Sequence, residues 1–115
     1  MAASSVSQAD PTSFNFNVAH VATIQAGLLE LASRLNFSVG REIDDLEEYD
    51  AAYLQLGDGF PFCLSKYKSR PSNATEVFFA SRLNDWEAPL EEICSALGIK
   101  SSELLWKNVA YTKTP

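Results

Sequence analysis

The sequence predicts an α+β fold, in which an N-terminal helix and a C-terminal helix pair pack on a three-stranded antiparallel sheet. Two observations carry this prediction. Apolar residues recur at helical spacing near both ends of the chain, and two β-prone runs flank a Gly-Asp-Gly turn in the middle. With 115 residues, of which 46% are hydrophobic, the chain suits one core. We therefore expect a disordered, small and polar tail over residues 1–13 and a single α+β domain over residues 14–115.

The first predicted helix covers residues 18–35. Its apolar side chains follow the spacing of three to four positions that is typical of an amphipathic helix: Val21, Ile24, Leu28, Leu31, Ala32 and Leu35. Asn17 is the expected N-cap. Asn36 tolerates the left-handed conformation that ends a helix, so we expect the helix to stop there.

The predicted sheet begins with residues 52–56, which alternate between two faces. Gly57-Asp58-Gly59 forms the turn of a hairpin with residues 60–67, and residues 75–81 form the third strand. The alternation places Tyr53, Tyr67 and Phe78 on the face that the helices do not cover. Because a large uncovered apolar face is typical of a partner or dimer surface, we expect a homodimer.

The predicted C-terminal helix pair begins after Asn84 or Asp85. One apolar stripe defines the first of these helices: Trp86, Leu90, Ile93, Cys94 and Leu97. Gly98 followed by Ile99 is typical of a Schellman motif, which ends a helix. Ser101 or Ser102 then caps a short last helix over residues 103–108.

The negative charge of the chain is concentrated in one segment. Nine basic and fifteen acidic residues give a net charge of −6. Residues 42–50 contain six acids and no base: Glu42, Asp44, Asp45, Glu47, Glu48 and Asp50. Residues 37–39 could form a short strand, but we expect residues 37–50 to form a solvated loop or short helix, since these crowded carboxylates would repel one another and not be paired individually. Such a local block can contact a basic partner, with Tyr49 and Tyr53 as aromatic anchors.

The sequence disfavours most catalytic chemistry. His20 is the one histidine, so a Ser-His-Asp or Cys-His arrangement would have to use it, and we expect it at a helix border. Cys63 and Cys94 lie among apolar neighbours, and we expect both to be reduced and buried. Zinc spacing and the EF-hand order are both missing. We therefore expect neither enzymatic activity, nor a cofactor, nor a metal.

A nucleic-acid-binding regulator is the alternative function. Lys66, Lys68 and Arg70 form a basic strand end around Tyr67, which could contact a nucleic-acid backbone and stack on a base. Residues 90–105 (LEEICSALGIKSSELL) also resemble the helix pair that ends repressor-type helix-turn-helix domains. The second helix of the pair has Lys107 as its one base, whereas a recognition helix uses polar and basic side chains.

The first hypothesis is a non-enzymatic protein-binding module of the cytoplasm. Residues 1–13 have neither the basic residue nor the apolar stretch of a secretory signal. Small acidic cytosolic proteins include immunity proteins that inhibit a toxin, secretion chaperones and nucleic-acid mimics. The expected partner is a protein with a basic surface, bound through Glu42, Asp44, Asp45, Glu47, Glu48, Tyr49, Asp50 and Tyr53. An enzyme or ligand-binding domain whose site forms in a dimer is a third hypothesis.

Overall fold

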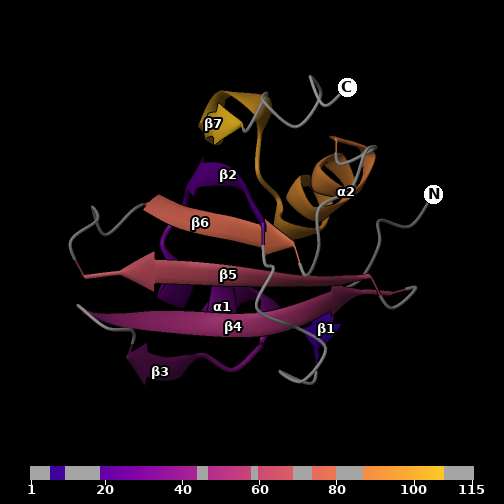
Figure 1. The fold of residues 1–115 in the computed structure, drawn as a ribbon. Helices are drawn as coiled ribbons and strands as arrows, with labels where there is room; N and C mark the ends of the chain where they lie inside the picture. Colours follow the sequence, from indigo (N-terminus) through magenta and orange to yellow (C-terminus); the bar gives the residue numbers. More distant parts are fainter. Residues whose placement is uncertain are drawn as a thin grey trace.

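The computed structural model describes residues 6–9, 19–43, 47–57, 60–68, 74–79 and 87–107 (Figure 1). In this part of the chain the elements are β1 (Val6–Gln8), β2 (Ala19–Gln25), α1 (Leu28–Leu35), β3 (Gly40–Ile43), β4 (Glu48–Leu56), β5 (Pro61–Tyr67), β6 (Ala74–Phe79), α2 (Glu87–Leu97), the 3₁₀ turn η2 (Ser101–Glu103) and β7 (Leu104–Lys107). The predicted three-stranded sheet with a C-terminal helix pair is therefore wrong, because the described strands form a seven-stranded sheet.

All the strands of this sheet pair antiparallel, in the order β1-β4-β5-β6-β2-β7, and β3 also pairs with β4 (Figure 1). The predicted hairpin of β4 and β5 and the predicted third strand, β6, are confirmed at its centre. β3 and β1 share one edge of β4: β3 pairs with residues 48–51, and β1 pairs with residues 54–56. A pocket lies between these two short strands.

Strand alternation gives the sheet an inner face and an outer face. The inner face packs against α1 and α2, and its fully buried side chains include Leu54, Phe62, Leu64, Val77 and Phe79. Burial of each such side chain contributes about 1.5–3 kcal/mol. The outer face carries Tyr53 opposite Cys63, which is opposite Phe78. The prediction that Tyr53, Tyr67 and Phe78 share the face away from the helices is thus confirmed.

The predicted N-terminal helix is wrong in its first half. Residues 19–25 form strand β2, and α1 begins at Leu28 after Gly27. A bulge between His20 and Ala22 puts Val21 and Ala22 together beside Val77, on the inner face with Ile24. The bulge therefore creates a spacing of three between Val21 and Ile24, which imitates a helix. The end of α1 at Asn36 is confirmed, with φ of 62°.

The C-terminal prediction is half right. The first helix, α2, ends in the predicted Schellman motif, in which Gly98 has φ of 74° and the Ile99 amide donates to the Cys94 carbonyl at 2.8 Å. The predicted second helix is instead η2 and β7, because β7 pairs with β2 and satisfies its remaining backbone edge. The similarity to a helix-turn-helix pair consequently does not hold.

The N-terminal segment also differs from expectation. Val6–Gln8, within the expected disordered tail, form β1 and pair with the end of β4. The predicted caps Asn17, Asn84 and Asp85 lie outside the described residues. Neither α1 nor α2 has the length and apolar character needed to cross a membrane, and this holds for every helix in the described part of the chain.

Candidate functional site

The acidic segment forms a β-hairpin, so the predicted loop or short helix is wrong. Strand β3 pairs with β4 in the register Arg41 opposite Asp50 and Glu42 opposite Tyr49. In this arrangement Glu42 lies on the outer face of the sheet, whereas Glu48 and Asp50 lie on the inner face, so the two faces share the negative charge that a helix would concentrate. Asp44 and Asp45 lie between the two strands, outside the described residues.

On the inner face of this hairpin, two carboxylates are paired individually, contrary to expectation. Arg41 Nε donates to Asp50 Oδ1 at 2.6 Å, and Arg41 Nη1 lies 3.4 Å from Glu48 Oε1. Lys68 Nζ lies 2.6 Å from the same Glu48 oxygen. The hydrogen bond and charge of Lys68 lower the pKa of Glu48, and those of Asp50 raise the pKa of Arg41. Glu48 and Asp50 are therefore neutralised locally.

On the outer face, three of the predicted site residues come together. Glu42 lies opposite Tyr49, Tyr49 lies opposite Tyr67, and Tyr53 lies four residues further along β4 on the same face. The Tyr49 and Tyr67 rings stack with centroids 4.6 Å apart and planes 22° apart. We call Glu42, Tyr49, Tyr53 and Tyr67 the hairpin face. All four side chains are half-buried.

Two groups at this face keep their protons at neutral pH. Burial, followed by the neighbouring Cys63 and Glu42, raises the pKa of the Tyr53 phenol well above its usual range. Hydrogen bonding with Glu42 adds to this effect. Burial likewise raises the pKa of the Cys63 thiol to about 11. The Tyr53 hydroxyl thus stays protonated and can donate to Glu42, and Cys63 is not a thiolate nucleophile.

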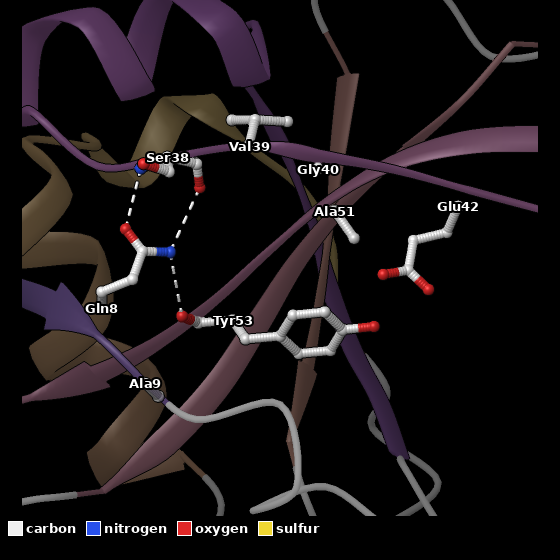
Figure 2. A pocket seen from close by; sticks show the side chains of 8 residues that line it. All are labelled: Gln8, Ala9, Ser38, Val39, Gly40, Glu42, Ala51 and Tyr53. Carbon is white, nitrogen blue, oxygen red and sulfur yellow. Dashed lines mark hydrogen bonds between the residues drawn. The ribbon is translucent and has the colours of Figure 1, made fainter.

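A pocket of about 310 Å³ opens beside Tyr53 (Figure 2). It is lined by Gln8, Ala9, Ser38, Val39, Gly40, Glu42, Ala51 and Tyr53. The hollow exists because Gly40 and Ala51 pair directly on the outer face. Gly40 has no side chain and Ala51 has one methyl group, whereas the neighbouring Glu42 and Tyr53 have larger side chains. A Cβ at Gly40 would find its nearest neighbour, the Ala51 carbonyl oxygen, at 4.0 Å.

Gln8 forms one wall of the pocket by joining β1 to the segment before β3. Its Nε2 donates to the Ser38 carbonyl at 3.2 Å and to the Tyr53 carbonyl at 3.4 Å. The Ser38 amide donates back to Gln8 Oε1 at 2.8 Å (Figure 2). The side-chain amide therefore replaces a backbone peptide in the gap between the two strands and fixes the width of the pocket.

Glu47 and Ile43 also belong to the acidic segment. Glu47 is half-buried just before β4. Ile43, at the end of β3, is 74% exposed and shares the inner face with Arg41. Sequence reasoning missed both the exposure of Ile43 and the roles of Gln8 and Gly40. A glycine at the start of a β-prone run is a signal for a close approach or hollow, so Gly40 could have been found.

The basic strand end and His20 have internal partners. Lys68 pairs with Glu48, and Lys66 Nζ donates to the Tyr67 carbonyl at 2.7 Å, while Arg70 lies outside the described residues. His20 lies on the outer face of β2, not at a helix border, and stacks on Phe78 with centroids 4.9 Å apart. These contacts reduce the positive charge available to a nucleic acid at Lys66 and Lys68.

The cysteines are both free, as expected. Cys63 is buried between β4 and β6, and its Sγ lies 3.5 Å from the Ser65 hydroxyl. Cys94 on α2 is half-buried, so the expectation of full burial holds for Cys63 alone.

Comparison with known proteins finds no matching family model, no significantly similar curated protein and no significantly similar solved structure.

Proposed function

We propose that this chain is a non-enzymatic protein-binding module of the cytoplasm, which binds a basic protein through the hairpin face. One observation carries the proposal: Glu42 and three tyrosines gather on one side of the hairpin, whereas Glu48 and Asp50 are neutralised on the other side. The face that remains acidic is thus also the aromatic one.

The hairpin face suits a lysine or arginine side chain. Among the described residues, the ion pairs join Arg41 and Lys68 to Glu48 and Asp50, and none involves Glu42. The charge of Glu42 is therefore available to a cation. Stacked tyrosine rings attract the same cation through their negative faces and lose little entropy when a partner binds.

The whole-chain charge supports the same kind of partner. A net charge of −6 attracts a basic surface at long range and accelerates the encounter, and salt screens this effect. The two free cysteines suit a reducing compartment such as the cytoplasm. A partner bound in this way should associate quickly at low salt.

The test begins with capture of a partner by the tagged chain. Association rates are then measured in a salt series for wild type, Glu42→Gln, Tyr49→Ala and the control Glu91→Gln. Glu91 is exposed on α2, so its substitution changes the net charge by the same amount away from the hairpin. We expect Glu42→Gln to slow association more than the control does, and most strongly at low salt.

Equal association rates for Glu42→Gln and Glu91→Gln would contradict the proposal. Light scattering provides the second arm. A mass of twice 12.7 kDa that returns to 12.7 kDa in Tyr49→Ala would place a second copy of the chain on the hairpin face, in place of a basic partner. The predicted homodimer would then be the correct interpretation of this surface.

A further inference from the structure

We propose that the pocket between β1 and β3 receives one arginine side chain of the basic partner. This inference rests on the proposed function, and it adds a specific receptor to the general attraction of the hairpin face. Three features support it: the size of the pocket, the single carboxylate in its lining, and the apolar character of the rest of the lining.

The pocket has the dimensions of a site for one side chain or a small molecule. Its volume of about 310 Å³ is at the lower end of the usual range for such sites, roughly 300–1,000 Å³. The hydrogen bonds of Gln8 to Ser38 and Tyr53 hold one wall of the pocket in place. Gly40 pairs with Ala51 at its base, so no side chain larger than a methyl group fills the pocket there. The hollow is therefore formed by the paired backbone of β3 and β4 and by the Gln8 side chain, which three hydrogen bonds hold in place.

The charge in the pocket selects a cation. Glu42 is the one ionisable carboxylate among the lining residues, and no lysine or arginine lines the pocket in the described part of the chain. Figure 2 shows the Tyr53 phenol oxygen directed toward the Glu42 carboxylate. A carboxylate has about four acceptor positions, so Glu42 can accept from Tyr53 and still bind two more donors.

The apolar lining favours arginine among the possible cations. Ala9, Ala51 and the Tyr53 ring line the pocket with carbon atoms that can contact the methylene groups of a long side chain. A planar guanidinium can bind the Glu42 carboxylate through two parallel hydrogen bonds and lie against the Tyr53 ring, whereas an ammonium offers a point charge. An anion such as a phosphate would be repelled by Glu42.

The probe is N-acetyl-arginine amide, titrated into the ¹⁵N-labelled full chain. Its uncharged analogue, N-acetyl-citrulline amide, keeps the shape and removes the charge. We expect saturable shifts of the Gly40, Ala51 and Tyr53 backbone amides with the arginine probe. Affinity for the citrulline probe should be lower by about tenfold or more, because the charge-assisted hydrogen bonds are lost.

Two variants separate filling of the pocket from loss of its charge. Gly40→Leu places a side chain in the hollow; among the described residues positive φ occurs at Asn36 and Gly98, so Gly40 needs no glycine conformation. It should abolish binding of the arginine probe. Glu42→Gln should weaken binding about tenfold or more, and the control Glu91→Gln should leave it unchanged. If circular dichroism shows that Gly40→Leu does not fold, the comparison of probe binding between Glu42→Gln and Glu91→Gln still tests the proposal.

The outcomes distinguish this inference from the proposed function. Equal binding of the arginine and citrulline probes, or probe binding that survives both variants, would overturn the arginine pocket. A hexa-arginine peptide that shifts Tyr49 and Tyr67 but leaves Gly40 and Ala51 unmoved would also overturn it, while leaving the hairpin face as a basic-protein site. Absence of binding by both probe and peptide would overturn the two proposals together.

Discussion

Replacing Leu64 with alanine tests the register of the whole sheet. Leu64 lies in the central strand β5, is 0% exposed, and pairs with Ala52 and Val77. The substitution removes three carbon atoms, which corresponds to about 2.4 kcal/mol at about 0.8 kcal/mol per buried methylene. The cavity left behind adds a further term, so we expect the free energy of unfolding to fall by about 3–4 kcal/mol.

Urea unfolding followed by far-ultraviolet circular dichroism measures this loss. With a slope of about 1–3 kcal/mol per molar urea, the midpoint should fall by roughly 1–4 M. Ser65→Ala is the matched control, because Ser65 is the next residue of β5 and lies on the outer face. Its substitution should cost less than about 1.5 kcal/mol. Since a slip of one residue exchanges the two faces, a larger loss for Ser65→Ala than for Leu64→Ala would refute the register.

Other contacts lead to equally direct measurements. Thr75→Val should lower the free energy of unfolding by about 1–3 kcal/mol, because the buried Thr75 hydroxyl donates to the Ala26 carbonyl at 2.5 Å; a melting temperature within about 1 °C of wild type would contradict this. A thiol reagent at about pH 8 should modify Cys94 before Cys63, since burial raises the pKa of Cys63 to about 11 and the thiolate is the reacting form. Denaturant should make both thiols reactive, and equal native rates would argue against this arrangement. The pKa of Glu48 is lowered from its ordinary 4.5, so its ion pairs stabilise the fold fully above about pH 4.5 and lose that contribution as the pH falls through the lower folded pKa. Glu48→Gln should therefore flatten the acid limb of a plot of stability against pH, and an unchanged slope would show that these ion pairs do not contribute.

Local signals in the sequence predicted the turns and the ends of helices. Asn36 and Gly98 both adopt the left-handed conformation expected of them. The hairpin between β4 and β5 and the third strand, β6, also follow from local pattern. These features were predictable because the residue types themselves restrict the backbone, through the missing side chain of glycine and the tolerance of asparagine for positive φ.

The spacing of apolar residues gave the wrong secondary structure where a strand contains a bulge or is followed by a helix. Val21 and Ile24 are three positions apart because of a bulge, and Ile24 and Leu28 are four apart because the chain leaves β2 and enters α1. Neither interval comes from a helical turn. Leu104 and its neighbours were also predicted as a helix from their local sequence. They form a strand because β2 offers them a backbone edge for pairing.

The candidate site was predictable in its parts but not in its arrangement. Alternation alone placed Tyr53 and Tyr67 on the face away from the helices, and the structure confirms this. The acidic composition of residues 42–50 was evident, yet its division between two faces was not. That division depends on the pairing of β3 with β4 and on Lys68, which follows β5 and reaches Glu48 across the sheet.

By itself, the sequence determined the hairpin at the centre of the sheet, the alternation of its two faces and the residues that end both helices. The tertiary structure alone decided that Val6–Gln8 and Leu104–Lys107 join the sheet as strands. It also decided which carboxylates are neutralised and where the pocket lies. The physical reason is that backbone edges and ion pairs are satisfied by groups distant in the chain, whereas turns and caps depend on the conformational limits of single residues.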